Sequence, residues 1–95
     1  MNTKPATAAA IRQFILARYA EQLAACGHST ESIRDDFDLL QESVIDSLGI
    51  LEMVSAVETE FDATIDLEAI DADDLTKIGP FCRYAADAIR TTLGS

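Results

Sequence analysis

The sequence predicts an all-α domain that forms a four-helix bundle. The bundle has three longer helices and one short helix, with a long loop between the first two long helices. Apolar residues recur at helical spacing in three stretches, and no stretch shows the alternation of a β-strand. With 95 residues, 48% of them hydrophobic, the chain is large enough for one core. We therefore expect a single domain over residues 1–95, with residues 1–6 as a flexible lead-in.

The first helix is predicted to begin near Thr7 and to end at Gly27, which suits the left-handed position that closes a helix. Its apolar face follows steps of three and four residues: Ile11, Phe14, Ile15, Tyr19 and Leu23.

Residues 28–46 lack a steady period and predict a long loop. We expect apolar residues of this loop to fasten it across the bundle: Ile33, Phe37, Leu39, Leu40, Val44 and Ile45.

The second long helix is predicted over residues 47–61. It carries a buried stripe at helical spacing: Ile50, Met53, Val54, Val57 and Phe61. Residues 62–70 break the pattern, and a short helix is expected at about residues 71–77. Pro80 marks the start of the last helix, because its missing N–H costs nothing in the first turn. The apolar side of that helix is predicted to be Phe81, Tyr84, Ala85, Ala88, Ile89 and Thr92.

The charge of the chain is strongly negative, with 17 acidic and 7 basic residues and a formal net charge of −10. Fifteen of the acids lie between Glu31 and Asp74, where Arg34 is the only base. Such a surface repels nucleic acids and anionic membranes and attracts partners with Lys/Arg patches. Without an apolar run that could span a membrane or form a signal peptide, we expect a cytoplasmic protein. We also expect a monomer.

Two cysteines, Cys26 and Cys82, lie far apart without a CxxC motif or a nearby histidine cluster, so we expect no resident metal. Cys82 falls in an apolar helical pattern and is predicted to be buried. Cys26 closes a helix and is predicted to be partly exposed. The sequence does not support a disulfide between them.

The segment with the most chemical information is Asp46-Ser47-Leu48, at the start of the second long helix. On residue type alone, Asp46 and Ser47 are good helix caps, because their oxygens accept from unpaired N–H groups. The longer stretch VIDSLGILEMVSAVETEF, residues 44–61, closely resembles the signature of acyl and peptidyl carrier proteins. The resemblance extends more weakly to residues 65–67 and to the helix that Pro80 opens, and it implies a bundle of the acyl-carrier type.

This resemblance implies that Ser47 is the attachment point of a 4′-phosphopantetheine arm, donated by coenzyme A through a phosphopantetheinyl transferase. The chain would hold an acyl or aminoacyl group on that arm as a thioester and present it to other enzymes, without being an enzyme itself. Asp46 would help to hold a metal ion in the complex with the transferase. Exposure at a loop–helix junction and the positive end of the helix dipole suit a phosphodiester at this position.

The resemblance also implies that the second long helix is the docking face for a cargo-loading ligase or acyltransferase and for downstream enzymes. The residues carried over for this role are Leu48, Glu52, Ser55 and Thr59. Gly49, Ser55 and Thr59 depart from the pattern of fatty-acid carriers. They favour a specialised free-standing carrier, such as one for an amino acid or an unusual acyl group. Fatty acyl, polyketide, aminoacyl and peptidyl cargoes all stay open.

Three other functions are alternatives to the carrier function. A hydrolase would need a base for Ser47, but the only histidine is His28, and no G-x-S-x-G motif surrounds the serine. A calcium loop that started at Asp62 would have Leu67 where an EF-hand requires glycine. A carrier-like acidic interaction module without the arm is the remaining alternative, and the intact Asp-Ser-Leu motif argues against it.

Overall fold

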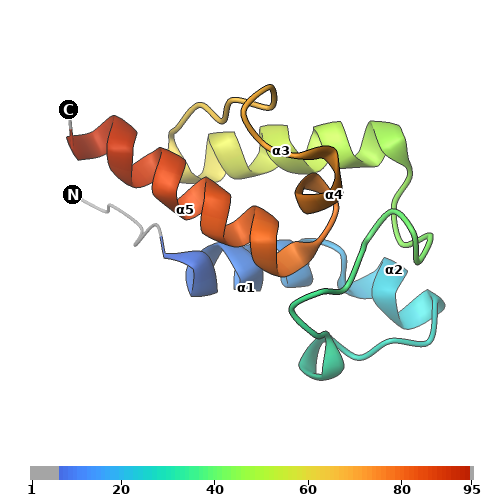
Figure 1. The fold of residues 1–95 in the computed structure, drawn as a ribbon. Helices are drawn as coiled ribbons and strands as arrows, with labels where there is room; N and C mark the ends of the chain where they lie inside the picture. Colours follow the sequence, from blue (N-terminus) through green and yellow to red (C-terminus); the bar gives the residue numbers. More distant parts are fainter. Residues whose placement is uncertain (1–6, 95) are drawn as a thin grey trace.

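The computed structural model describes residues 7–94 and, of residues 90–94, only the backbone. The expected flexible lead-in, residues 1–6, lies outside the described residues. Within residues 7–94 the regular elements are helices and there is no strand, which confirms the all-α class. These elements are α1 (Ala8–Arg18), α2 (Ala20–Ala25), the 3₁₀ helix η1 (Thr30–Ser32), α3 (Ser47–Phe61), α4 (Ala72–Leu75) and α5 (Ile78–Gly94). Helix α1 packs against α3 and α5, and α5 also packs against α4 (Figure 1).

The predicted first helix is divided in two at Tyr19. Thr7 caps α1 by accepting from the backbone N–H of Ala10, and Gly27 closes the segment with φ of 87°, as expected. Tyr19 departs from helical geometry at φ −109° and ψ 21°. Its N–H still donates to Ile15 and its carbonyl still accepts from Leu23, so the chain bends without opening a loop. Ile15, Tyr19 and Leu23 all stay buried across this bend.

The stripe predicted for α3 forms part of the core, because Ile50, Met53, Val54, Val57 and Phe61 are all buried. The helix ends at Asp62, which takes the left-handed conformation at φ 54°. Glu58 then accepts a hydrogen bond of 2.7 Å from the backbone N–H of Ile65, which holds the chain close to α3 as it turns away. The period read from the sequence therefore predicts both the bounds and the buried face of α3.

The last helix begins at Ile78, two residues before the predicted start, and α4 is shorter than expected at Ala72–Leu75. Within α5, Phe81, Ala85 and Ile89 are buried, while Tyr84 and Ala88 are half-buried. The side chain of Thr92, the last residue of the predicted apolar side, lies outside the described part.

The earlier start of α5 has a physical cause in its first turn. The N–H of Ile78 donates to the carbonyl of Phe37 at 3.0 Å, and that of Gly79 donates to Asp35 at 2.8 Å. Pro80 has no N–H to satisfy, and Phe81 donates to Lys77. Because the loop supplies the missing acceptors, the helix can begin before its proline.

The long loop is held by backbone pairing as well as by its apolar residues. Besides the two bonds to α5, the N–H of Leu39 donates to Thr76 at 2.9 Å, and Asp38 and Lys77 form an isolated antiparallel bridge. The predicted apolar anchors Ile33, Leu39, Val44 and Ile45 are buried, and Phe37 is half-buried. Leu40 was also predicted to fasten the loop, and this is wrong: it is among the exposed large hydrophobic residues, because the turn that Asp38 caps points it outward.

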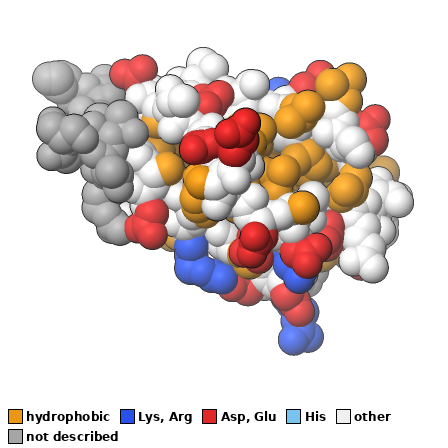
Figure 2. All heavy atoms as spheres, turned by 45° about the horizontal axis from the view of Figure 1, so that its top comes forward, with side chains coloured by type: hydrophobic (Ala, Val, Ile, Leu, Met, Phe, Trp, Pro, Cys, Tyr) orange, Lys and Arg blue, Asp and Glu red, His pale blue; other side chains and the backbone are white. Residues whose placement is uncertain are grey.

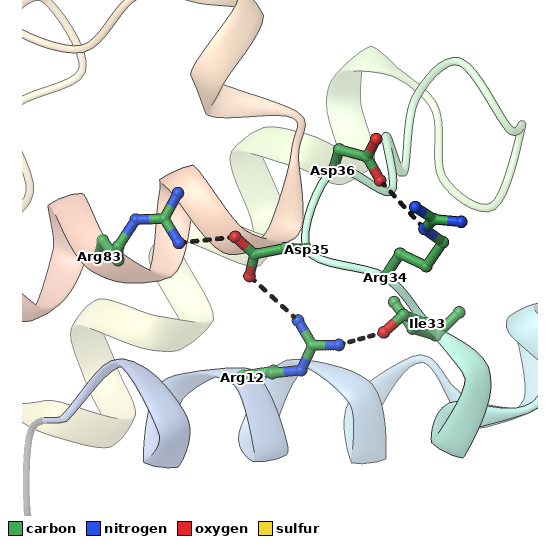
Figure 3. Close-up of polar contacts among 6 residues, drawn as sticks. All are labelled: Arg12, Ile33, Arg34, Asp35, Asp36 and Arg83. Carbon is green, nitrogen blue, oxygen red and sulfur yellow. Dashed lines mark hydrogen bonds and ion pairs between the residues drawn. The ribbon is translucent and has the colours of Figure 1, made fainter.

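Three charged side chains join the loop to α1 and α5 beside this backbone pairing (Figure 3). Asp35 accepts from Arg83 at 2.7 Å and lies 3.8 Å from Arg12, which also donates to the carbonyl of Ile33. We call Arg12, Asp35 and Arg83 the Asp35 cluster. Its hydrogen bond from Arg83 lowers the pKa of Asp35 below its ordinary value, with smaller contributions from the charges of Arg83 and Arg12. The cluster ties α1, the loop and α5 together.

We predict that the Asp35 cluster makes stability depend on pH in acid. Because the pKa of Asp35 is lowered in the folded state, its contribution is complete above about pH 4 and is lost as the pH falls through the folded-state pKa. The measurement is the unfolding free energy of the wild type and of Asp35→Asn from pH 7 to pH 2. We expect the difference between them to be largest above pH 4 and to vanish in strong acid; a difference that stays constant over this range contradicts the prediction.

Gly79 is predicted to be needed for this cluster because a Cβ there would lie 2.2 Å from Cγ of Asp35. In Gly79→Ala the carboxylate must rotate away from its arginine partners. We therefore expect the pKa of Asp35, measured by NMR titration, to rise toward its ordinary value, as it should in Arg83→Gln. Gly49→Ala is the matched control, since a Cβ at that position meets Ile45 and Asp46 instead. A lowered pKa that persists in Gly79→Ala would show that the carboxylate has not moved.

Candidate functional site

Ser47, the predicted attachment point, is the exposed first residue of α3. Asp46 precedes it as the N-cap, with extended backbone at φ −93° and ψ −175°. Its Oδ1 accepts from the N–H of Gly49 at 2.7 Å, and its carbonyl accepts from Ile50 at 2.9 Å. Asp46 is therefore the residue that caps α3, and the hydroxyl of Ser47 is left out of the capping hydrogen bonds.

The first turn of α3 keeps two open hydrogen-bond donors. Of its first three N–H groups, that of Gly49 is bound by Asp46, whereas those of Ser47 and Leu48 have no acceptor among residues 7–94. Both groups lie beside the Ser47 hydroxyl at the positive end of the helix dipole. An anion attached to this hydroxyl would find unpaired donors next to it, so the residues present fit a phosphodiester.

The chain reaches Ser47 through a tight turn over residues 38–43. Oδ1 of Asp38 accepts from the N–H groups of Leu40 and Gln41, and Ser43 takes a left-handed φ of 63°. The N–H groups of Val44 and Ile45 then both donate to the carbonyl of Leu39. Since Val44 and Ile45 are buried directly before Asp46, the chain is anchored up to the cap and Ser47 emerges on the surface.

Gly49, which departs from the carrier pattern, has a local packing reason. A Cβ at this position would lie 3.0 Å from Cβ of Ile45 and 3.2 Å from Oδ1 of Asp46. Any larger residue would therefore crowd the contact between the first turn and the loop, or the capping carboxylate. The glycine brings the cap close to the buried end of the loop.

The predicted docking residues Leu48, Glu52, Ser55 and Thr59 are all exposed on α3. Leu48 is 64% exposed, and it is joined by Leu51 at 49%, which the sequence analysis did not assign. The sequence could have predicted that Leu51 is exposed next to Leu48, because Leu51 lies outside the buried stripe and three residues after Leu48 on the helix. Figure 2, which brings the top of Figure 1 forward, shows exposed hydrophobic side chains bordered by Asp and Glu side chains.

The contacts found for His28 and Cys26 are with residues other than Ser47. The His28 ring stacks edge-on against Phe37 with centroids 4.9 Å apart, and its Nε2 lies 3.9 Å from Glu42. Cys26 is exposed, as predicted, with Sγ 3.9 Å from the carbonyl of Ser43. Cys82 is buried, also as predicted, and burial raises its pKa to about 12, so this thiol stays protonated and belongs to the core.

Across the described residues, no group of three or more His, Cys, Asp or Glu side chains is arranged to hold a metal ion. None of the helices within that same part of the chain has the length and hydropathy needed to cross a membrane.

Comparison with known proteins found no family model, no curated protein and no solved structure that matches this chain. The site is therefore interpreted from its own geometry and from the motif in the sequence.

We predict that Asp46 stabilises the fold through the oxygen that caps α3. Asp46→Ala leaves the N–H of Gly49 without an acceptor and should lower the unfolding free energy by about 1 kcal/mol, or ~4–8 °C in melting temperature. Asp46→Asn keeps an acceptor and should melt close to the wild type. Thermal unfolding followed by circular dichroism measures both, and equal losses in the two variants would show that the cap is not what Asp46 contributes.

Proposed function

We propose that this chain is a carrier protein of the acyl-carrier type, which holds an acyl or aminoacyl group as a thioester on a 4′-phosphopantetheine arm attached to Ser47. The single observation that carries the proposal is the exposed Ser47 hydroxyl at the first residue of α3, beside the unpaired N–H groups of Ser47 and Leu48. The Asp-Ser-Leu motif and the helical arrangement around it support the same function, within a four-helix carrier bundle.

The residues at the start of α3 would have different roles in this function. Bound to Ser47, the arm supplies the thiol that carries the cargo. The N–H groups of Ser47 and Leu48 stabilise the phosphodiester, because the helix dipole and unpaired donors favour an anion there. Asp46 uses Oδ1 for the cap, and its other oxygen is left to approach a metal ion in the complex with the transferase. No resident metal is proposed.

Docking in this proposal uses the exposed face of α3. Leu48 and Leu51 provide an apolar centre next to the arm, and Glu52 provides a negative charge beside it. No Lys or Arg occurs between Ser47 and Phe61, so partner enzymes with basic patches would meet no repulsion on this helix. Contacts of this kind are fast, weak and sensitive to salt. The partners proposed are the transferase, a cargo-loading ligase or acyltransferase, and enzymes that accept the cargo.

The second candidate is an acidic interaction module that never carries the arm. The exposed pair Leu48 and Leu51 favours it, since an apolar patch bordered by acids can bind a partner without any prosthetic group. The two candidates differ in one observable, which is whether Ser47 becomes modified.

The test is to incubate the purified chain with coenzyme A, magnesium and a broad-specificity phosphopantetheinyl transferase and then to measure the intact mass. We expect the wild type to gain one phosphopantetheinyl group and Ser47→Ala to gain none. Asp46→Asn, which keeps the cap, reports on the carboxylate itself: slower modification of this folded variant assigns it a role in the transferase complex. No gain in wild-type mass with several transferases would favour the interaction module.

A further inference from the structure

An open groove of about 530 Å³ lies between α1 and α3. Phe14 and Arg18 of α1 form one side, and Glu52, Ser55, Ala56 and Thr59 of α3 form the other. The Phe14 ring is fixed by an edge-to-face contact with Phe61, with centroids 5.9 Å apart. The middle of the groove is hollow because the α3 residues between Glu52 and Glu60 that line it, Ser55, Ala56 and Thr59, have small side chains. We call it the α1–α3 groove.

The charges of this groove favour a cation at its end nearest Ser47. Glu52 is exposed, and its carboxylate makes no hydrogen bond or ion pair with another described residue. Arg18, across the groove, keeps its positive charge but points to Tyr19: its Nε lies 3.4 Å from the Tyr19 hydroxyl, and its guanidinium lies 5.7 Å from the centroid of that ring. The groove is therefore lined by two acids and one base. Glu60 adds a further acidic side chain at the distant end. Exposed hydroxyls of Ser55 and Thr59 lie between the two acids.

The groove is also within reach of Ser47. At 1.5 Å per residue, Glu52 lies ~7.5 Å and Ser55 ~12 Å along the axis of α3 from Ser47. An extended pantetheine arm is comparable to about five residues of extended chain, or ~16 Å. Its thiol end can therefore lie beside Glu52 and Ser55, with the middle of the arm over exposed Leu48.

We infer that the α1–α3 groove receives the loaded end of the arm, and that the cargo it fits is an aminoacyl group whose α-ammonium pairs with Glu52. This inference rests on the proposed function, because it requires the arm on Ser47. A long hydrocarbon chain fits poorly, since it would cover the carboxylate and hydroxyls of the groove without replacing their hydrogen bonds to water. A small amino acid offers an ammonium whose N–H groups can donate to Glu52 and to a neighbouring hydroxyl, and an apolar part for Phe14.

The test compares two cargoes that differ only in the ammonium. Alanyl- and propionyl-phosphopantetheine are attached to Ser47 from their coenzyme A thioesters, intact mass verifies loading, and amide NMR shifts are compared with those of the unloaded arm. We expect the alanyl form to shift Ser55, Ala56 and Thr59, and the propionyl form to shift them much less. Glu52→Gln should lower the bound population of the alanyl end by roughly two- to fivefold, the size of an exposed ion pair.

Glu31→Gln is the matched control, because Glu31 is exposed in η1 and does not line the groove. It should leave the alanyl-dependent shifts unchanged. Equal shifts for the two cargoes, or shifts confined to the neighbours of Ser47, would overturn the inference while the carrier function stands. Shifts that depend on protein concentration would place a second copy in the groove and overturn it as well. Failure to load either cargo shows up first as an absent mass gain and counts against the carrier function itself.

Discussion

The backbone pairing between residues 35–39 and 76–79 is the constraint on which the rest of this structure depends. Three N–H···O bonds join the loop to the junction of α4 and α5, and they reach across about forty residues of sequence. Apart from η1, the loop has no helix to satisfy its backbone, so these bonds give it a defined path. Two of these bonds, from the N–H groups of Ile78 and Gly79, satisfy the first turn of α5. Because the paired loop leads directly to the start of α3, the pairing helps to determine where Ser47 lies on the surface.

The backbone pairing also brings charged side chains together. Gly79 leaves the space that the carboxylate of Asp35 occupies, and that carboxylate gathers Arg12 and Arg83 on the side of α1 and α5. In a chain of net charge −10, the cluster occupies two of the seven basic residues. The face of α3 keeps its acids without competing cations of its own.

The sequence predicted what local chemistry determines. The period of apolar residues located α3 with its buried stripe and placed Cys82 in the core. Residue type gave Asp46 and Ser47 as candidate caps, of which Asp46 is the cap. The sequence did not predict the early start of α5, because the acceptors for Ile78 and Gly79 belong to a distant loop. Leu40 was misjudged for the same kind of reason, since the turn at Asp38 decides where its side chain points. The α1–α3 groove depends on how two helices pack, which no single helical pattern contains.

Cargo and partners would meet on the same face of α3, and this has a consequence for how the carrier would work. A partner that brings a Lys or Arg to Glu52 removes the acid with which an aminoacyl ammonium pairs in the α1–α3 groove. Because exposed ion pairs contribute only ~0.2–1 kcal/mol each, exchanging one cation for another costs little and is fast. Docking would then release the loaded arm toward the partner, without any rearrangement of the helices, since Ser47 is fixed in place by the loop and by the cap at Asp46.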